Sequence, residues 1–232
     1  APSESTRQEL IERGIREEKV LVYPRGIDIE RFTPEKRNGY YAARYGVRAD
    51  IHLLYVGRVS REKNLDILAA AYRKIRAAYP NTHLIVVGDG PYREEMQRRL
   101  SDLPCTFTGT LDGDDLVKAY ASADLFLFPS TTDTFGNVVL EAQACGLPVV
   151  VSDQGGPVEN MLPGKTGLVA RGDDVEAFRD AVVSLLESPR RLKTMGLEAR
   201  RYMQERSFDA AFLQTWESYK TIKPTDSLPR VA

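Results

Sequence analysis

Two carboxylates, Asp133 and Glu141, stand in a stretch of small polar residues that could bind a hydroxylated ligand. The stretch STTDTFGNVVLE (130–141) follows the apolar run LFLF (125–128) and begins a helix whose first turn presents free backbone N–H groups. Seven residues separate the two acids, so one lies in the loop and the other well inside the helix. Because carboxylates accept hydrogen bonds from hydroxyl groups, such a pair could hold two different sugar rings.

Simpler roles for both acids stay open. Asp133 would also serve as a helix cap, and Glu141 would also satisfy a neighbouring backbone or basic group. Glu141 lies between Leu140 and Ala142, where a buried carboxylate is costly unless it has a partner. This position favours a functional interpretation of Glu141.

A second stretch, GRVSREKN (57–64), lies where another apolar strand ends and a helix begins. Ligands bind at that edge of open α/β sheets. Gly57 permits close approach of the backbone, and Arg58 and Lys63 supply positive charge beside the positive end of a helix dipole. The combination predicts a site for a diphosphate. The spacing equally allows both side chains to be ordinary solvated surface charges.

Two glycine-rich turns follow two further strands. GDGP (88–91), which contains Gly90, and SDQGGPVEN (152–160) each come directly after an apolar run. The second turn places a proline at the expected first position of a helix. Ordinary structural turns explain both stretches nearly as well. The stronger indication is their convergence, because four loops that follow four strands would line one crevice.

Alternating strands and helices must position these loops. Apolar runs predict strands at 51–56, 82–87, 105–108, 125–128 and 148–152, and periodic segments predict helices near 65–79, 92–101, 112–123 and 135–145. Asp112 is expected to cap the third of these helices. Apolar strands separated by helices form a parallel sheet that is covered on both faces. The fold class is therefore α/β, a Rossmann-like doubly wound parallel sheet.

The two ends of the chain show different patterns. The expected elements are a charged helix at 4–18, a strand at 19–23 (KVLVY), a turn-rich linker at 24–38, and helices at 173–187, 189–205 and 207–220. The unpaired edge of the strand at 19–23 would invite self-association with another chain.

Composition excludes several classes of protein. With 42% hydrophobic and 28% charged residues the chain is expected to fold, and a net charge of -1 gives no basic field for nucleic acid. Cys105 and Cys145 lack metal-binding spacing and indicate reduced core residues in a cytoplasmic protein. No apolar run is long enough to span a membrane. His52 and His83 begin strands and are interpreted as structural, so no metal is implied.

Together the motifs resemble a known family. GRVSREKN, GDGP, FPSTTDTFGNVVLEAQACGLPVV, SDQGGPVEN and GKTGLV occur in an order and spacing that resemble the C-terminal domain of retaining GT-B glycosyltransferases of family 4. The resemblance covers about Ile51 to Phe208, and its most specific part is the pair of acids separated by seven residues. It implies a nucleoside-diphosphate sugar as the donor, with no metal and no separate cofactor.

The resemblance also implies roles for individual residues. Arg58 and Lys63 would hold the donor pyrophosphate, and Glu141 would bind the ribose hydroxyls. Asp133 stands where the family has Glu, which shortens the side chain by about 1.5 Å and leaves the contacted hydroxyl open. The candidate catalytic residues are thus Arg58, Lys63 and Asp133. The candidate substrate-binding residues are Gly57 and Gly90, Phe107 and Gly109 near the base, Thr134, Phe135 and Gly136 against the sugar and phosphate, Asn137, Val138, and Glu141.

A complete enzyme of that family would have a second, N-terminal domain with the acceptor site and a catalytic His. The expected division is 1–26 as the last helix and strand of that domain, 27–45 as the linker, 46–208 as the nucleotide-sugar-binding domain, and 209–232 as a helix and tail that cross back. The expected reaction transfers a hexose with retention to a sugar or lipid acceptor, in a protein that could sit peripherally on a membrane through the missing half. The alternatives are a GT-B epimerase or phosphorylase and a non-catalytic nucleotide-sugar-binding module.

Overall fold

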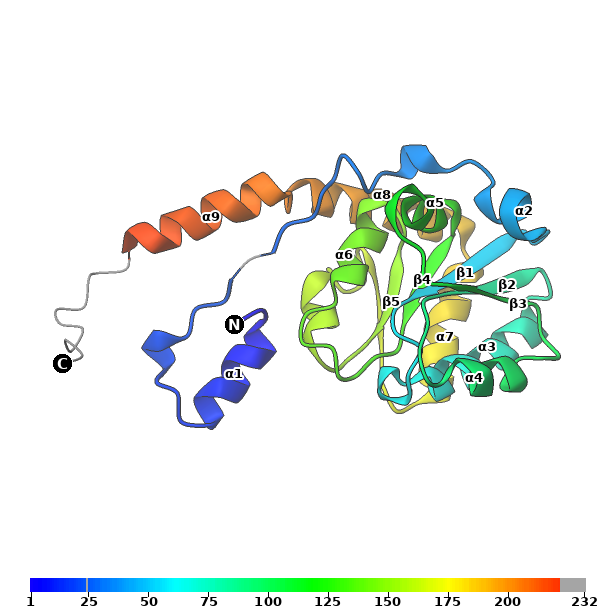
Figure 1. Ribbon diagram of the computed structural model, residues 1–232, viewed down its shortest axis with the longest axis horizontal. Coiled ribbons are helices and arrows are strands. Elements are labelled where there is room, and N and C mark those ends of the chain that lie inside the picture. The colour runs from blue at the N-terminus through cyan, green and yellow to red at the C-terminus, as the bar shows by residue number, and fades with distance from the viewer. Residues whose placement is uncertain (24, 222–232) are drawn as a thin grey trace.

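The computed structural model describes residues 1–23 and 25–221 and contains a six-stranded parallel sheet (Figure 1). The strands are β1 Ile51–Val56, β2 Thr82–Val87, β3 Cys105–Gly109, β4 Leu125–Phe128, β5 Val149–Ser152 and β6 Gly167–Ala170. Their order across the sheet is β3-β2-β1-β4-β5-β6, and all neighbours pair in parallel. The predicted Rossmann-like sheet is confirmed.

Helices cover both faces of this sheet (Figure 1). One face carries α3 (Leu65–Ala78), α4 (Arg93–Arg99) and α7 (Val175–Leu186), and the other carries α5 (Gly113–Ser122), α6 (Asn137–Ala144) and α8 (Pro189–Gln204). α3 packs on α7, and α6 packs on α8. Because both faces of the sheet are covered, the central strands β1, β4 and β5 are mostly apolar.

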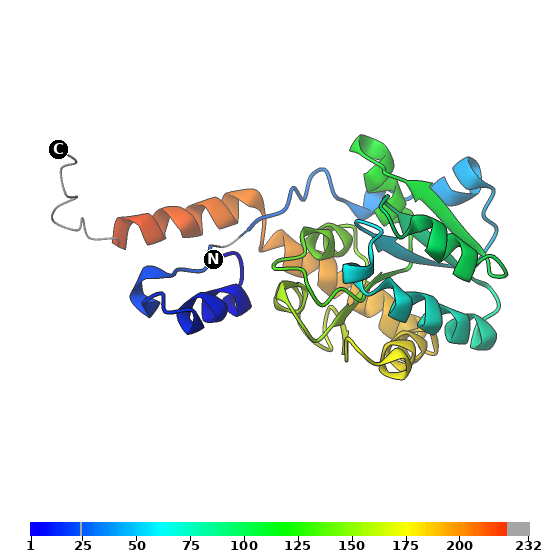
Figure 2. The same cartoon turned by 60° about the horizontal axis from the view of Figure 1, so that its bottom comes forward.

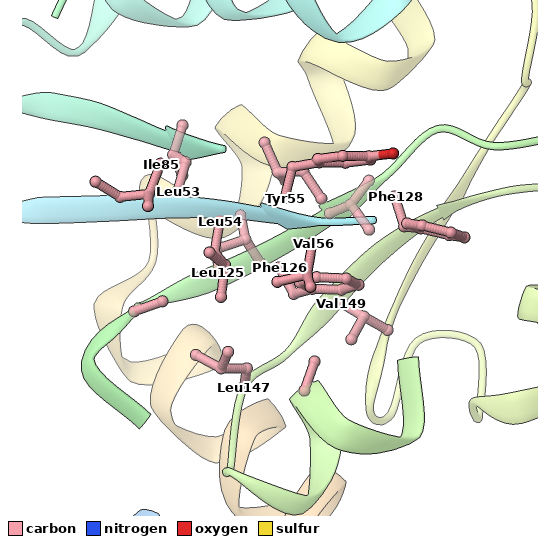
Figure 3. Packing of buried hydrophobic residues seen from close by; sticks show 14 of the residues in the cluster. Leu53, Leu54, Tyr55, Val56, Ile85, Leu125, Phe126, Phe128, Leu147 and Val149 are labelled. Carbon is pink, nitrogen blue, oxygen red and sulfur yellow. The ribbon is translucent and has the colours of Figure 1, made fainter. Parts of the chain in front are cut away.

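The core lies on both sides of the central strands (Figure 3). Leu53 and Leu54 are successive residues of β1, point to opposite faces, and are both 0% exposed. The rings of Tyr55 and Phe128 stack with centroids 6.0 Å apart, and those of Phe126 and Phe128 with centroids 5.9 Å apart. Burial of one such leucine contributes about 1.5–3 kcal/mol to stability. The strands therefore form a rigid platform for the loops at their carboxyl ends.

The segment before β1 packs on the sheet domain. Ile27 and Phe32 are buried, and Arg200 of α8 donates hydrogen bonds to the carbonyl oxygens of Phe32 at 2.8 Å and Ile29 at 3.1 Å. A short helix that the sequence did not predict, α2 (Tyr40–Tyr45), follows. Residues 27–45, expected to be an interdomain linker, thus contribute side chains to the core.

The prediction of a strand at 19–23 is wrong. The structure has a 3-10 turn at Glu17–Lys19, and Leu21 and Tyr23 are exposed. The backbone of this segment closes on the first residue instead of a sheet, since the N–H of Tyr23 donates to the Ala1 carbonyl at 2.8 Å and the Ala1 amino group donates to the Leu21 carbonyl at 2.6 Å. The strand edge on which self-association was expected to rest is therefore not formed.

Two differences occur near the end of the sheet. β6 was not predicted because it begins with a glycine, which leaves an apolar run of only three residues. That glycine, Gly167, lies against β5, where a Cβ atom would stand 2.2 Å from the Val149 carbonyl oxygen. After β5 the structure has a 3-10 helix at Gly156–Asn160 instead of the expected α-helix. Asp112 occupies the predicted N-cap position of α5, but its side chain makes no cap hydrogen bond.

The two terminal helices lie on one side of the sheet domain (Figures 1 and 2). α9 (Phe208–Thr221) projects from it, and Phe212 and Trp216 are 64% and 53% exposed. The first helix, α1 (Glu4–Glu12), is held where the Glu159 carboxylate accepts the backbone N–H groups of its first two residues at 2.6 and 2.8 Å. No helix in the described residues is long and apolar enough to cross a membrane.

Candidate functional site

The carboxyl ends of β1 and β4 form the topological switch point of the sheet. From β1 the chain proceeds to β2 on one side, and from β4 it proceeds to β5 on the other. The loops after these four strands therefore meet at one edge. Ligands of open α/β sheets bind in the crevice at such a point.

The loops after β1 and β2 are joined backbone to backbone. The N–H of Val59 donates to the Asp89 carbonyl at 2.9 Å, and the Val59 carbonyl accepts the N–H of Tyr92 at 3.0 Å. A Cβ atom on Gly88 would stand 1.9 Å from the Gly57 carbonyl oxygen, and one on Gly90 would stand 2.3 Å from the Val59 carbonyl oxygen. These two glycines are required because no side chain fits between the loops.

The loops after β4 and β5 are joined in the same way. The N–H of Gly156 donates to the Asp133 carbonyl at 2.8 Å, and a Cβ atom on Gly156 would stand 2.2 Å from the Thr134 carbonyl oxygen. The side-chain amide of Asn160 donates to the Phe135 carbonyl. The predicted turn at 152–160 therefore fixes the loop that carries the candidate sugar-binding residues.

α6 begins at this fixed loop without a side-chain cap. Its N-cap is Gly136, which adopts a left-handed conformation with φ of 79°. The alternative that Asp133 caps the helix is excluded, since its carboxylate bonds elsewhere. Uncapped N–H groups and the helix dipole favour an anion at this end. Asn137 is exposed here and Val138 is partly buried.

Asp133 and Lys63 contact each other across the crevice. The Asp133 Oδ2 atom accepts the Lys63 ammonium at 2.7 Å and the Ser130 hydroxyl at 2.8 Å. The two side chains are 25% and 19% exposed, so water screens this pair only in part. The structure thus pairs two residues for which the sequence indicated separate contacts to a ligand.

Arg58 belongs to the same loop after β1 as Lys63 and has an exposed side chain. Its backbone is fixed, because its carbonyl oxygen accepts the hydroxyl of Tyr55 at 2.9 Å. Burial raises the pKa of Tyr55 far above its ordinary value, so this hydroxyl remains a donor. Within the described part of the chain the Arg58 guanidinium forms no ion pair. It is therefore available to an external anion.

Glu141 lies deeper, in α6, beside a cavity of about 550 Å³. Asn137 and Leu140 also line this cavity, together with residues before α2 and the start of α9. The Glu141 Oε2 atom accepts the hydroxyl of Tyr120 at 2.7 Å. Burial raises the pKa of the Glu141 carboxyl, and the hydrogen bond from Tyr120 and the charge of Arg31 act in the opposite direction.

The predicted site residues thus gather at one edge of the sheet. Phe107 and Gly109 end β3, and the Gly109 carbonyl accepts the N–H of Gly88 at 2.8 Å, which places the end of β3 beside the other loops. The cavity beside Glu141 does not include Arg58, Lys63 or Asp133. The crevice therefore has a cationic part at the switch point and a separate part along α6.

Sequence reasoning missed three side chains of this region. Ser130 was noted only as a small polar residue, and Tyr120 only as part of a helix. Arg25, which belongs to the expected linker, lies with its guanidinium carbon 4.8 Å from the centroid of the Phe135 ring and also lines the cavity. Only tertiary packing brings them to the site.

The two histidines lie away from the crevice, at the amino ends of β1 and β2. His52 and His83 are partners in the strand register. Burial lowers the pKa of His83 to about 4, with smaller contributions from His52 and Arg76. Among residues 1–23 and 25–221, no group of three His, Cys, Asp or Glu side chains could hold a metal ion.

Comparison with known proteins identifies the family. The family model described as glycosyl transferases group 1 matches residues 50–188. Sulfoquinovosyl transferase SQD2 of Arabidopsis thaliana is 35% identical over 217 residues, which are 90% of this chain and 42% of that protein. A GDP-mannose-dependent phosphatidylinositol monomannoside mannosyltransferase of Mycolicibacterium smegmatis is 38% identical over 191 residues, or 77% of this chain and 50% of that protein. The chain spans about half the length of these curated relatives.

A solved structure supports the fold. The crystal structure of HepE from Anabaena in complex with UDP has a TM-score of 0.86 to this chain at 24% identity, and the match covers 96% of this chain and 63% of HepE. The family model covers more than half of the chain, and the six-stranded parallel sheet agrees with the similarity to the HepE fold. The chain therefore belongs to the group 1 glycosyl transferases and is the C-terminal domain of a GT-B fold.

Proposed function

We propose that this chain is the donor-binding half of a retaining hexosyltransferase. The observation that carries the proposal is the crevice at the switch point, where Arg58, Lys63 and the uncapped start of α6 converge on one edge. This combination suits the diphosphate of a sugar nucleotide. The acceptor and the remaining catalytic groups belong to an N-terminal half that residues 1–26 would complete.

Arg58, Lys63 and the dipole of α6 would stabilise the negative charge that builds on the diphosphate when the glycosidic bond to it breaks. Groups fixed in advance at such a position are effective because they need no reorganisation during the reaction. The rigid backbone contacts between the loops supply that preorganisation. Glu141 would hold the ribose, and Asp133 would face the transferred sugar after exchanging Lys63 for it.

Binding of different nucleoside diphosphates tests which base the donor carries. GDP is one candidate because the name of the Mycolicibacterium relative specifies GDP-mannose, and UDP is another because HepE was solved with UDP. We expect one of UDP, GDP and ADP to raise the thermal stability of the chain. A ligand at one hundred times its dissociation constant adds about 2.7 kcal/mol. Absence of a shift with all three would overturn the proposal.

The alternatives differ in their products. A non-catalytic module would bind the nucleotide but form no glycoside when joined to the N-terminal half, and an epimerase would change the sugar without an acceptor. Mass spectrometry of a reaction with the two halves together, a sugar nucleotide and mixed sugar and lipid acceptors separates these outcomes. A cytoplasmic location is part of the same proposal, in line with the two free cysteines, Cys105 and Cys145.

A further inference from the structure

Tyr120 is a buried tyrosine of α5 whose hydroxyl group contacts the candidate site. Its side chain is 0% exposed, and its hydroxyl donates to the Oε2 atom of Glu141 at 2.7 Å. The ring is held by Phe32 and Phe126, whose centroids lie 6.0 and 5.9 Å away. Tyr120 therefore has one orientation, and that orientation points its hydroxyl at the carboxylate.

The contact leaves one carboxylate oxygen for other partners. A carboxylate has two oxygens, and Tyr120 occupies only Oε2. Glu141 also lines the cavity of about 550 Å³, whose wall includes Arg31 from the segment before α2. A long side chain on the edge of a cavity samples several rotamers unless a fixed group restrains it. The hydroxyl of Tyr120 supplies such a restraint from the core.

We propose that Tyr120 is the positioning residue of the nucleotide site, and that its hydroxyl fixes Glu141 so that the second carboxylate oxygen accepts a hydrogen bond from a ribose hydroxyl. This inference rests on the proposed function. Tyr120 itself touches no ligand. Its role is to set the direction of the Glu141 carboxylate and to favour its ionised, accepting form.

Two further facts support the second part of this role. Burial raises the pKa of Tyr120 well above its ordinary value, and the charge of Glu141 adds to that effect, so the phenol stays protonated and can only donate to this partner. The charged and titratable groups that act on Glu141 are Tyr120 from α5, Arg31 from the preceding segment, and Cys145 from the end of α6.

The test compares Tyr120→Phe with the wild-type chain by calorimetry. The probes are UDP, GDP and ADP, each measured beside its 2′,3′-dideoxy analogue. We expect the variant to lose about tenfold in affinity for the ribonucleotide, which corresponds to about 1.4 kcal/mol, and less than twofold for the analogue. In a Glu141→Ala background Tyr120→Phe should cause no further loss. Equal losses for both probes, or additive losses in the double variant, would show a merely structural tyrosine.

Tyr72→Phe is the matched control. Tyr72 is also 0% exposed, and its hydroxyl donates to the carbonyl oxygens of Pro104 at 2.5 Å and Thr82 at 3.3 Å, but it lies in α3 on the other face of the sheet. The affinity of Tyr72→Phe for the ribonucleotide and for its dideoxy analogue should be unchanged. Its stability should be comparable to that of Tyr120→Phe.

A pH series gives an independent readout. Protonation of Glu141 removes its acceptor, so ribonucleotide affinity falls as the pH drops through the carboxyl pKa. Removing the hydroxyl of Tyr120 raises that pKa, and the midpoint of the fall should move to higher pH in Tyr120→Phe. An unmoved midpoint would contradict the inference. If the wild-type chain binds none of UDP, GDP and ADP, the proposed function itself fails, which is distinct from binding with equal losses in Tyr120→Phe.

Discussion

At the scale of single residues, the ion pair between Lys63 and Asp133 affects how tightly an anion can bind in the crevice. In the proposed site a diphosphate would compete with the Asp133 carboxylate for the Lys63 ammonium, which lies 2.7 Å from it. Partly buried pairs of this kind are screened less than surface pairs. In that proposal the short Asp133 side chain therefore concerns Lys63 as well as the sugar.

This competition makes Asp133→Asn informative. We expect the variant to keep or improve its affinity for a free nucleoside diphosphate, because Lys63 is released, and to lose affinity for the corresponding nucleotide sugar, because a sugar contact is weakened. The loss for the sugar nucleotide should be about 1.5–3 kcal/mol. Calorimetry with UDP against UDP-glucose, or the matching GDP pair, measures both. Parallel losses for the two ligands would place Asp133 away from the sugar.

Arg58→Ala should weaken binding of the nucleoside diphosphate itself. The guanidinium offers charged hydrogen bonds worth about 1.5–3 kcal/mol to an oxyanion. Arg48→Ala is the control, since Arg48 is also an exposed arginine but precedes β1 at the opposite edge of the sheet. Isothermal titration of both variants decides the point. An unchanged affinity in folded Arg58→Ala would remove Arg58 from the site.

At the scale of elements, the sequence predicted what depends on local pattern. The strands at 51–56 and 125–128 were predicted because both of their faces are largely buried, so every position except His52 is apolar. The segment at 19–23 has the same composition, but a strand also needs a hydrogen-bonding neighbour, and composition does not report one. The contact of Tyr120 with Glu141 depends on how α5 packs on α6. The residues are twenty-one positions apart, and no local rule relates them.

The glycines between the loops can be tested as an element. In Gly88→Ala the new Cβ atom would stand 1.9 Å from the Gly57 carbonyl oxygen, so the loops after β1 and β2 must separate. We expect a loss of several kcal/mol of stability, beyond the roughly 1–2 kcal/mol that left-handed backbone costs an alanine. Gly46→Ala measures the cost of the left-handed backbone alone, because Gly46 has φ of 67° and nothing within 4 Å of its Cβ position. Equal urea midpoints for the two variants would contradict the close approach.

The burial of His83 in β2 has a consequence for the stability of the fold at acidic pH. Burial lowers the folded-state pKa of His83 to about 4, below its ordinary value, so protonation favours the unfolded chain. Stability should therefore decline as the pH falls from about 6.5 towards 4. After a discount for the partial exposure of the ring, His83 accounts for about 1–2 kcal/mol of that loss. Urea unfolding of His83→Gln at pH 7 and pH 4.5 should show a smaller decline than the wild type.

At the scale of the whole molecule, binding and chemistry are expected to separate. The loops that could hold the donor lie between Gly57 and Asn160, within one rigid sheet domain, whereas the group 1 relatives are about twice as long. We predict that this chain binds a nucleoside diphosphate and transfers no sugar alone. Loss of acceptor positioning removes about 7–11 kcal/mol of barrier lowering.

Incubation of the chain with each sugar nucleotide and a pool of sugar and lipid acceptors, followed by mass spectrometry, tests this separation. Multiple-turnover product from the 232 residues alone would contradict it. The rings of Phe212 and Trp216 on α9 and the side chains of Leu21 and Tyr23 are exposed. The sequence did not predict the exposure of Phe212 and Trp216, because an amphipathic pattern does not show whether the apolar face of a helix is covered.

The backbone contacts beneath the crevice limit which positions can be substituted to change the ligand. At Gly88, Gly90 and Gly156 a substituent of any kind would collide with a neighbouring carbonyl, so these positions cannot be varied to suit another donor. The backbone there offers the same N–H and C=O groups whatever the sequence. A library designed to alter the ligand should therefore leave these glycines unchanged and diversify exposed side chains such as Arg25, which lines the cavity beside Glu141.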